Sequence, residues 1–273
     1  MARKPRPLRS AIAWSDADHV VVRGLDLPGE ILGRMGLGEF AFLQLTGRAP
    51  SAEETRLFEA IVICLVEHGL TPSALAARLT YLGAPESLQG AVAAGILGLG
   101  SVFVGSLEGA ARMLRAAVAA APAGAPLGPL AEAIVAEHVA AGRIIPGLGH
   151  PVHKPVDPRA PVLFALAAET GFAGRHVQLM QLVGAEAERV TARSLPVNAT
   201  GAIGAICCEL GLPAHVVRGI GVMARAIGLV GHLLEESRDP IAGELWRRAD
   251  EEASAWAREQ GGGAGPEAGP GSG

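Results

Sequence analysis

Four prolines crowd one short segment near the middle of the chain, at positions 146, 151, 155 and 158. Because proline fixes φ and lacks a backbone N–H, this segment, Ile144 to Arg159, can form neither a continuous helix nor a central strand. Gly147 and Gly149 add backbone conformations that other residues resist. The pattern predicts a rigid loop.

Basic side chains are spaced along this loop at His150, His153, Lys154 and Arg159. A stiff loop that carries cations at fixed spacing is suited to holding an anionic ligand. A proline-rich surface connector could have the same composition, and composition alone favours that plainer interpretation.

Apolar residues recur at helical spacing through most of the remaining chain. Ser51 followed by Glu54 has the form of a capping box. Only residues 9–27, with Val20 to Val22 near their end, favour extended structure. Helical segments of ordinary length with short links predict an all-α fold with a short N-terminal β arm. The helices are expected near residues 28–46, 52–68, 72–82, 107–120, 130–141, 161–170, 175–193, 201–210 and 213–236.

The composition limits the class of protein. With 273 residues, 49% of them hydrophobic, the chain can bury a sizeable core, and its net charge of -4 argues against a general nucleic-acid binder. Cys64, Cys207 and Cys208 form no zinc or disulfide pattern, so we expect a reducing cytoplasm. The basic N-terminus has no apolar run behind it, which argues against a secretory signal.

The stretch between Glu86 and Glu108 carries no charged residue. Its length matches the ~20 apolar residues of a membrane-spanning helix, but glycines and serines dilute its hydrophobicity. We therefore expect one or two short helices buried at a subunit interface, and no membrane contact. From residue 261 onward the chain holds only Gly, Pro, Ala, Ser and Glu, which predicts a disordered tail over 261–273.

The last long predicted helix places two strongly polar residues, Arg225 and His232, in an apolar stretch from Gly219 to Leu234. They are seven residues apart and so share a face of the helix. A cation in such a place needs an anionic partner or ligand. A structural ion pair with a core glutamate and a ligand site are equally compatible with this pattern.

The loop and this helix both resemble a known family. Gly147-Leu-Gly-His150, followed by Asp157-Pro-Arg159, resembles the signature loop of the citrate synthase superfamily, above all in citryl-CoA lyase and the C-terminal lyase region of ATP-citrate lyase. The segment Arg225 to His232 is similar to the lyase sequence Arg-Ser-Met-Gly-Phe-Ile-Gly-His. The resemblance runs from about Arg9 to about Trp246. Several matches in one order disfavour a helical scaffold with a chance loop match.

The resemblance implies roles for individual residues. His150 would be the catalytic histidine, which binds the hydroxyl or carbonyl oxygen of the substrate. Glu108 would be the acid that the lyases carry at this position. Other roles follow in the same way. Lys154, Gly147 and Gly149 would approach coenzyme A; Arg159 and Arg225 would bind carboxylates; His68 would neighbour the site; and Arg247 would cross into the partner subunit's site.

Two positions depart from the family pattern. Thr200, in Asn198-Ala-Thr-Gly201, stands where the lyases carry a catalytic aspartate, and threonine is no general base near neutral pH without help. Ala76 stands where a histidine would bind a substrate oxygen. The general base is therefore open between Glu108 and a water molecule held by Thr200. Separately, Arg78 or Tyr81, on the same helix as Ala76, could compensate for the lost polar groups.

The resemblance also implies an architecture and partners. We expect a large helical domain over 9–108 and 206–258 and a small domain over 109–205 that carries the His150 loop. The uncharged, glycine-rich run before Glu108 separately predicts a homodimer, possibly of higher order, because it would lower solubility if exposed. His150, Arg159 and Arg225 should converge on one cleft. Coenzyme A thioester would be substrate or product, with no tightly bound cofactor and no metal, and no ATP-binding phosphate loop is present.

The resemblance and its two departures imply two alternative functions. The first is a citryl-CoA lyase-like carbon–carbon lyase, or the reverse synthase, which cleaves a hydroxyacyl-CoA to acetyl-CoA and a keto acid such as oxaloacetate. Because Ala76 and Thr200 leave a less polar pocket, the acyl group is expected to be less charged than citryl. The second is a catalytically degenerate homologue that binds acyl-CoA or carboxylates as a regulatory protein.

Overall fold

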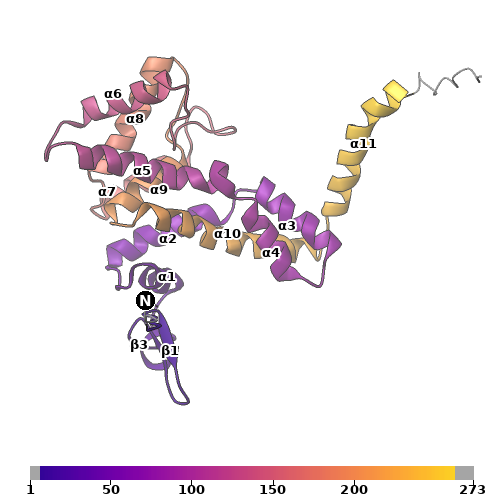
Figure 1. Cartoon of the computed structure of the whole chain (residues 1–273), viewed down its shortest axis with the longest axis horizontal. Helices are drawn as coiled ribbons and strands as arrows, with labels where there is room; N and C mark the ends of the chain where they lie inside the picture. The colour runs from indigo at the N-terminus through magenta and orange to yellow at the C-terminus, as the bar shows by residue number, and fades with distance from the viewer. Residues whose placement is uncertain (1–6, 262–273) are drawn as a thin grey trace, which may run out of the picture. The chain divides into compact units, whose positions relative to one another are not determined.

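The computed structural model describes residues 7–261 (Figure 1). These residues divide into two compact units. Unit 1 comprises the described residues up to Glu67 together with Gly100–Ala224, and unit 2 comprises His68–Leu99 with the described residues from Arg225 onward. The domain boundaries expected from the family resemblance stay a prediction. All but the first residue of the predicted disordered tail lies outside the described residues.

The N-terminal arm of unit 1 is a three-stranded antiparallel sheet in the order β1-β2-β3. Its strands are β1 (Ala13–Ser15), β2 (Val20–Val22) and β3 (Leu25–Asp26). Val22 pairs with Leu25 across a turn whose two residues, Arg23 and Gly24, both have positive φ. Such a turn matches the twist of the paired strands, and the predicted β arm is confirmed.

A helix was expected from near Pro28, but α1 spans only Leu37–Thr46. Pro28 instead lies in a single π-helical turn, η1 (Leu27–Ile31). The left-handed backbone of Gly33, with φ 72°, separates that turn from α1. Gly47 ends the helix with φ 78° and donates its N–H to the Leu43 carbonyl, as expected of a C-terminal glycine.

Helices build the rest of unit 1 around α9 (Ala199–Glu209), whose residues 199–208 are buried except for the half-buried Thr200. Helix α5 (Gly105–Ala120) packs against α9, and α6 (Leu127–Ala140) packs against α8 (Arg175–Thr191). The predicted capping box at Ser51 and Glu54 is confirmed at the start of α2 (Ala52–Val66), which packs against α7 (Arg159–Glu169). The mainly helical fold with its β arm is thus the one predicted.

Unit 2 contains α3 (Pro72–Gly83), α4 (Leu88–Leu97), the second half of α10 (Ala214–Glu236) and α11 (Ala242–Gly261). Its apolar core is Ala77, Ala91, Leu229 and Leu233. Helix α11 was not expected from the apolar pattern. Its surface carries Arg–Glu pairs at helical spacing, such as Arg248 with Glu244, which stabilise a helix without a wide apolar face.

The uncharged segment 86–108 forms α4, the π-helical turn η2 (Gly100–Val104) and the start of α5. Short helices are therefore confirmed, while burial between subunits stays a prediction. In the single chain Leu97 is 83% and Val102 is 78% exposed. By length and composition α10 could span a membrane, and so could α4 joined to the following helical segment, but core helices of soluble proteins pass the same test.

Candidate functional site

The His150 loop is attached to the residues that lead into α9. Leu148 and Val197 form an antiparallel bridge, and the Gly149 N–H donates to the Pro196 carbonyl at 2.8 Å. The Asn198 N–H donates in turn to the Gly147 carbonyl at 3.0 Å. The loop therefore has a defined backbone path, which its prolines alone would not give it.

Gly147 and Gly149 shape this path. Their φ values are +88° and +74°, in the left-handed region that favours glycine. A Cβ atom on Gly147 would also lie 2.5 Å from the Cα of Gly201, in the first turn of α9. These glycines have structural reasons to be present, and their predicted approach to coenzyme A stays a prediction.

His150 is oriented by the loop backbone. Its Nδ1 accepts hydrogen bonds from the N–H groups of Val152, at 3.1 Å, and His153, at 2.9 Å. These bonds place the proton of the neutral imidazole on Nε2, which becomes a donor. The ring stacks on His153 with 4.3 Å between centroids.

Arg159 lies beside this histidine. Its Nη2 is 3.5 Å from His150 Nε2, and its side chain is 27% exposed. Two donors at this separation can bind one ligand oxygen, or two oxygens of one carboxylate. The structure thus places together two of the residues predicted to bind substrate.

Asp157 holds Arg159 in place. Its carboxylate accepts from Arg159 Nε at 3.0 Å and Nη2 at 2.8 Å, and the Asp157 side chain is fully buried. Burial opposes ionisation, but the hydrogen bonds from Arg159 and from the backbone N–H groups of Ala199 and Arg159 lower the pKa of Asp157 to about 2. Sequence reasoning used Asp157 only as part of a motif; the Asp-x-Arg spacing was the available signal.

Thr200 lies in the first turn of α9. Its hydroxyl donates to Asn198 Oδ1 at 2.7 Å, and the same oxygen accepts the N–H of Gly201 at 3.1 Å as the helix cap. Asn198 Nδ2 donates to the Gly149 carbonyl at 2.6 Å. With its proton committed to Asn198, the Thr200 oxygen can accept a hydrogen bond from a ligand, but it offers no carboxylate to take a proton.

Glu108 lies in the first turn of α5 and is nearly covered, with 13% of its side chain exposed. Its carboxylate accepts from Arg112 Nε at 2.8 Å and pairs with Arg218 Nε at 2.6 Å. The Arg112 hydrogen bond and the charge of Arg218, opposed by burial, lower the pKa of Glu108. A carboxylate held by two guanidinium groups is a weak base, and this weighs against Glu108 as a substitute for the missing aspartate.

The remaining predicted residues are placed as follows. Lys154 is exposed on the loop of unit 1. In unit 2, Arg225 is half-buried on α10, and Arg247 on α11 is 53% exposed and paired with Glu244 and Glu251 of its own helix. His68 is the first residue of unit 2. The predicted convergence of His150, Arg159 and Arg225 stays a prediction.

Arg78 was considered as a side chain that could compensate for the polar groups lost at Ala76 and Thr200, but its guanidinium is engaged elsewhere. The side chain is 1% exposed, and its Nη1 donates to Glu236 at 2.7 Å, while Glu235 and His232 Nδ1 accept its other N–H groups. Glu236 also accepts the N–H groups of Ile241 and Ala242 at the start of α11. Arg78 is therefore committed to a buried ion pair that joins α3, α10 and α11.

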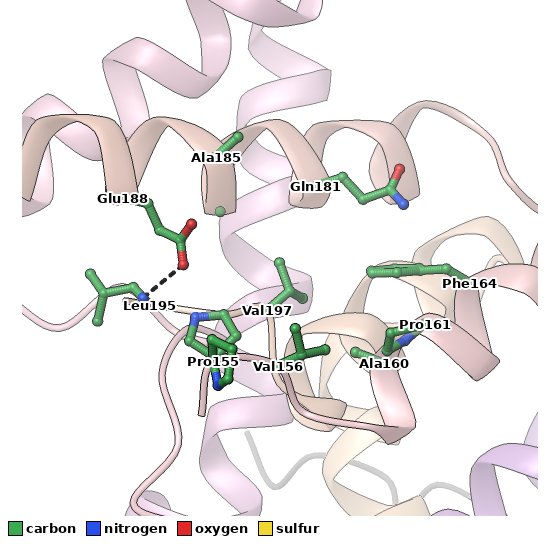
Figure 2. A pocket seen from close by; sticks show the side chains of 12 residues that line it. Pro155, Val156, Ala160, Pro161, Phe164, Gln181, Ala185, Glu188, Leu195 and Val197 are labelled. Carbon is green, nitrogen blue, oxygen red and sulfur yellow. Dashed lines mark hydrogen bonds between the residues drawn. The ribbon is translucent and has the colours of Figure 1, made fainter. Parts of the chain in front are cut away.

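A separate apolar pocket of about 310 Å³ lies between α7, α8 and the segments 155–156 and 195–197 (Figure 2). Phe164 and the two valines Val156 and Val197 form much of its lining, and Glu188 stands at one end, where it accepts the N–H of Leu195 at 2.9 Å. The twelve described residues that line it include none of the predicted site residues. An anionic ligand would find no cation among them.

Comparison with known proteins gives consistent matches. A family model described as "Citrate synthase, C-terminal domain" matches residues 32–249. Among solved structures, citryl-CoA lyase from Hydrogenobacter thermophilus is similar at 32% sequence identity and a TM-score of 0.77, over 86% of this chain and 88% of that chain. ATP citrate lyase from Methanothrix soehngenii, in complex with citrate and coenzyme A, shares the fold at 22% identity and a TM-score of 0.71, over 87% of this chain and 40% of that chain.

Among curated proteins, a probable ATP-citrate synthase from Caenorhabditis elegans is 23% identical over 257 residues. The match covers 87% of this chain and 22% of the relative. The chain thus spans about a fifth of the length of that relative.

Proposed function

The chain belongs to the citrate synthase family, and from that premise we propose that it cleaves a hydroxyacyl-CoA to acetyl-CoA and a keto acid, or catalyses the reverse condensation. The observation that carries the proposal is the pair of donors, His150 Nε2 and Arg159 Nη2, 3.5 Å apart on a fixed loop. This pair suits a substrate in which a hydroxyl or carbonyl oxygen lies near a carboxylate.

In the cleavage direction, a base removes the proton of the substrate hydroxyl, whose C–O bond becomes a carbonyl. The carbon–carbon bond breaks, and its electron pair passes to the thioester as an enolate, which is then protonated to give acetyl-CoA. His150 would hold the oxygen as it becomes a carbonyl, and Arg159 would hold a carboxylate. Arg225 and Arg247 are proposed to bind further carboxylates, His68 to neighbour the site, and Lys154 with Gly147 and Gly149 to contact coenzyme A.

Thr200 and Glu108, the two candidates for the base, are both poor proton acceptors. Thr200 offers a hydroxyl in place of a carboxylate, and Glu108 has a lowered pKa between two arginines. These observations favour a second candidate function, a homologue that binds acyl-CoA or carboxylates without turnover. They also agree with an enzyme slower than one that carries the aspartate, in which Thr200 orients a water molecule.

The acyl group is proposed to be less charged than citryl. Ala76 and Thr200 replace two strongly polar groups of the lyase pattern, and a buried substrate oxygen without its partner costs ~1–3 kcal/mol. Citryl-CoA should therefore be a poorer ligand than a thioester that lacks one of its carboxylates.

We further propose a cytoplasmic homodimer with residues 87–107 between the subunits. A molar mass of one chain, measured by light scattering at micromolar concentration, would refute the homodimer.

A thioester panel tests the function. The purified protein is incubated with citryl-CoA and with hydroxyacyl-CoA thioesters of lower charge, and products are followed by mass spectrometry. Formation of acetyl-CoA and a keto acid supports the lyase, whereas tight binding without products supports the binding protein. His150→Ala should abolish turnover or binding. His138→Ala serves as the matched control, because it alters a histidine whose Nδ1 lies 2.8 Å from the Ile134 carbonyl oxygen of its own helix. Neither turnover nor binding of any thioester would refute both functions.

A further inference from the structure

The strongest unassigned feature of unit 1 is the buried carboxylate of Asp157. We propose that Asp157 is a positioning residue, which fixes the Arg159 guanidinium to the first turn of α9 so that the loop and the Asn198–Thr200 segment present one rigid binding surface. The inference deepens the proposed function and rests on it for the class of ligand, an organic carboxylate.

The contacts of Asp157 join two parts of the chain that are far apart in sequence. Oδ1 accepts from the Arg159 backbone N–H at 3.1 Å and from Nε at 3.0 Å. Oδ2 accepts from Arg159 Nη2 at 2.8 Å and from the N–H of Ala199 at 2.9 Å. Ala199 is the first residue of α9, so one carboxylate binds both a side chain of the loop and the start of the buried helix.

The geometry of this pair leaves part of Arg159 available to a ligand. Asp157 takes one N–H of Nε and one of Nη2, which leaves the second N–H of Nη2 and both N–H groups of Nη1 outside the bidentate pair. A free arginine side chain has several rotatable bonds and loses much entropy when it is fixed. Because Asp157 fixes the guanidinium before a ligand arrives, binding a carboxylate should cost less ordering of the side chain.

The charge of Asp157 is also placed to stabilise α9. The N-terminus of a helix presents unpaired N–H groups and a partial positive charge, and a carboxylate there satisfies both. Thr200 lies in the turn that this carboxylate binds, one residue after Ala199. Loss of Asp157 would therefore loosen Arg159 and the Thr200 turn together.

Asp157 is not a hidden general base. It is fully buried, it accepts four hydrogen bonds, and the pKa of about 2 keeps it ionised but unable to take a proton near neutral pH. Its effect on a ligand must therefore pass through Arg159 and α9.

Nuclear magnetic resonance of arginine side chains tests the positioning directly and needs no activity. In the wild-type protein the Arg159 Nε–H signal, assigned with Arg159→Lys, should exchange slowly with water, and Asp157→Asn should remove that protection. Glu169→Gln is the matched control, because it neutralises the acid of an exposed ion pair with Arg56 near the end of α7. An Arg159 signal that exchanges as fast in the wild type as those of exposed arginines would overturn the proposal, even if Asp157→Asn does not fold.

Calorimetric titration with citrate then tests the consequence for binding. Asp157→Asn should weaken citrate binding at least about tenfold, Glu169→Gln should leave it unchanged, and Asp157→Asn combined with Arg159→Gln should bind no more weakly than Arg159→Gln alone. Fully additive effects would overturn the proposal. If the wild-type protein binds no citrate, citrate is not a ligand of this site. The exchange experiment then still decides whether Asp157 positions Arg159.

Discussion

Gly147 and Gly201 are packed backbone against backbone. A Cβ on Gly147 would lie 2.5 Å from Gly201 Cα, and a Cβ on Gly201 would lie 2.5 Å from the Gly147 carbonyl oxygen. Real Cβ atoms do not approach this closely, so a side chain at either position would push the loop away from α9. The contact therefore sets the spacing between His150, which follows on the loop, and Thr200, which precedes Gly201.

Alanine substitutions should show the importance of this contact. Gly147→Ala should lower the free energy of unfolding by about 2–5 kcal/mol, because it combines a positive φ with overpacking. Gly124→Ala is the control: Gly124 also has positive φ, 75°, but nothing lies within 4 Å of its added Cβ. Its cost should be only about 1 kcal/mol. Urea denaturation measures both, and equal losses would contradict a role for the contact.

The acid stability of the protein should depend on Asp157. Its pKa of about 2 lies below the unfolded value of 3.8, so the carboxylate stabilises the fold fully above about pH 4 and loses that contribution as the pH falls toward 2. The shift corresponds to a contribution on the order of 2 kcal/mol. The stability difference between wild type and Asp157→Asn should therefore be constant from pH 5 to 7 and shrink below pH 4. Urea midpoints across this range measure it, and a difference that does not change with pH would contradict the assignment.

The buried Arg78–Glu236 pair should be expensive to break. Arg78→Met leaves a Glu236 side chain that is 3% exposed without its guanidinium, which should cost about 3–5 kcal/mol. The same change in an exposed pair, Arg56→Met beside Glu169, should cost about 0–1 kcal/mol. Thermal and urea unfolding compare the two variants. Similar losses would mean that Arg78 contributes no more than a surface ion pair.

Restoring the lyase pattern should raise the cleavage of citryl-CoA. Thr200→Asp supplies a carboxylate in the first turn of α9, where the helix N-terminus favours negative charge, and Ala76→His supplies the missing donor. The double variant should cleave citryl-CoA at least about tenfold faster than the wild type, as followed by release of acetyl-CoA. Thr200→Asn is the control, since it has the shape of aspartate but cannot act as a base. Wild-type cleavage at roughly 1–1000 per second would show that another residue already does this work.

The sequence by itself determined the local structure and the family. Proline and glycine fix backbone conformation residue by residue, so the His150 loop, the helices from α2 to α10 and the β arm followed from pattern and spacing. The pattern around Gly147, His150 and Arg159 carried the resemblance, which the family match over residues 32–249 confirmed. The start of α1 was placed wrongly because apolar spacing continued through Gly33, whose left-handed backbone breaks the helix.

Only the tertiary structure decided which charged groups are partners. Asp157 meets Ala199, 42 residues away, and Arg78 meets Glu236, 158 residues away, and no local rule pairs residues at such distances. The sequence left Arg78 open as a substrate-binding group and Glu108 as a base. Packing committed Arg78 to Glu236, and it added Arg218 from α10 to Glu108, which already pairs with Arg112 four residues along its own helix. The physical reason is that a side chain's chemistry depends on its burial and its nearest charges, which are properties of the folded chain.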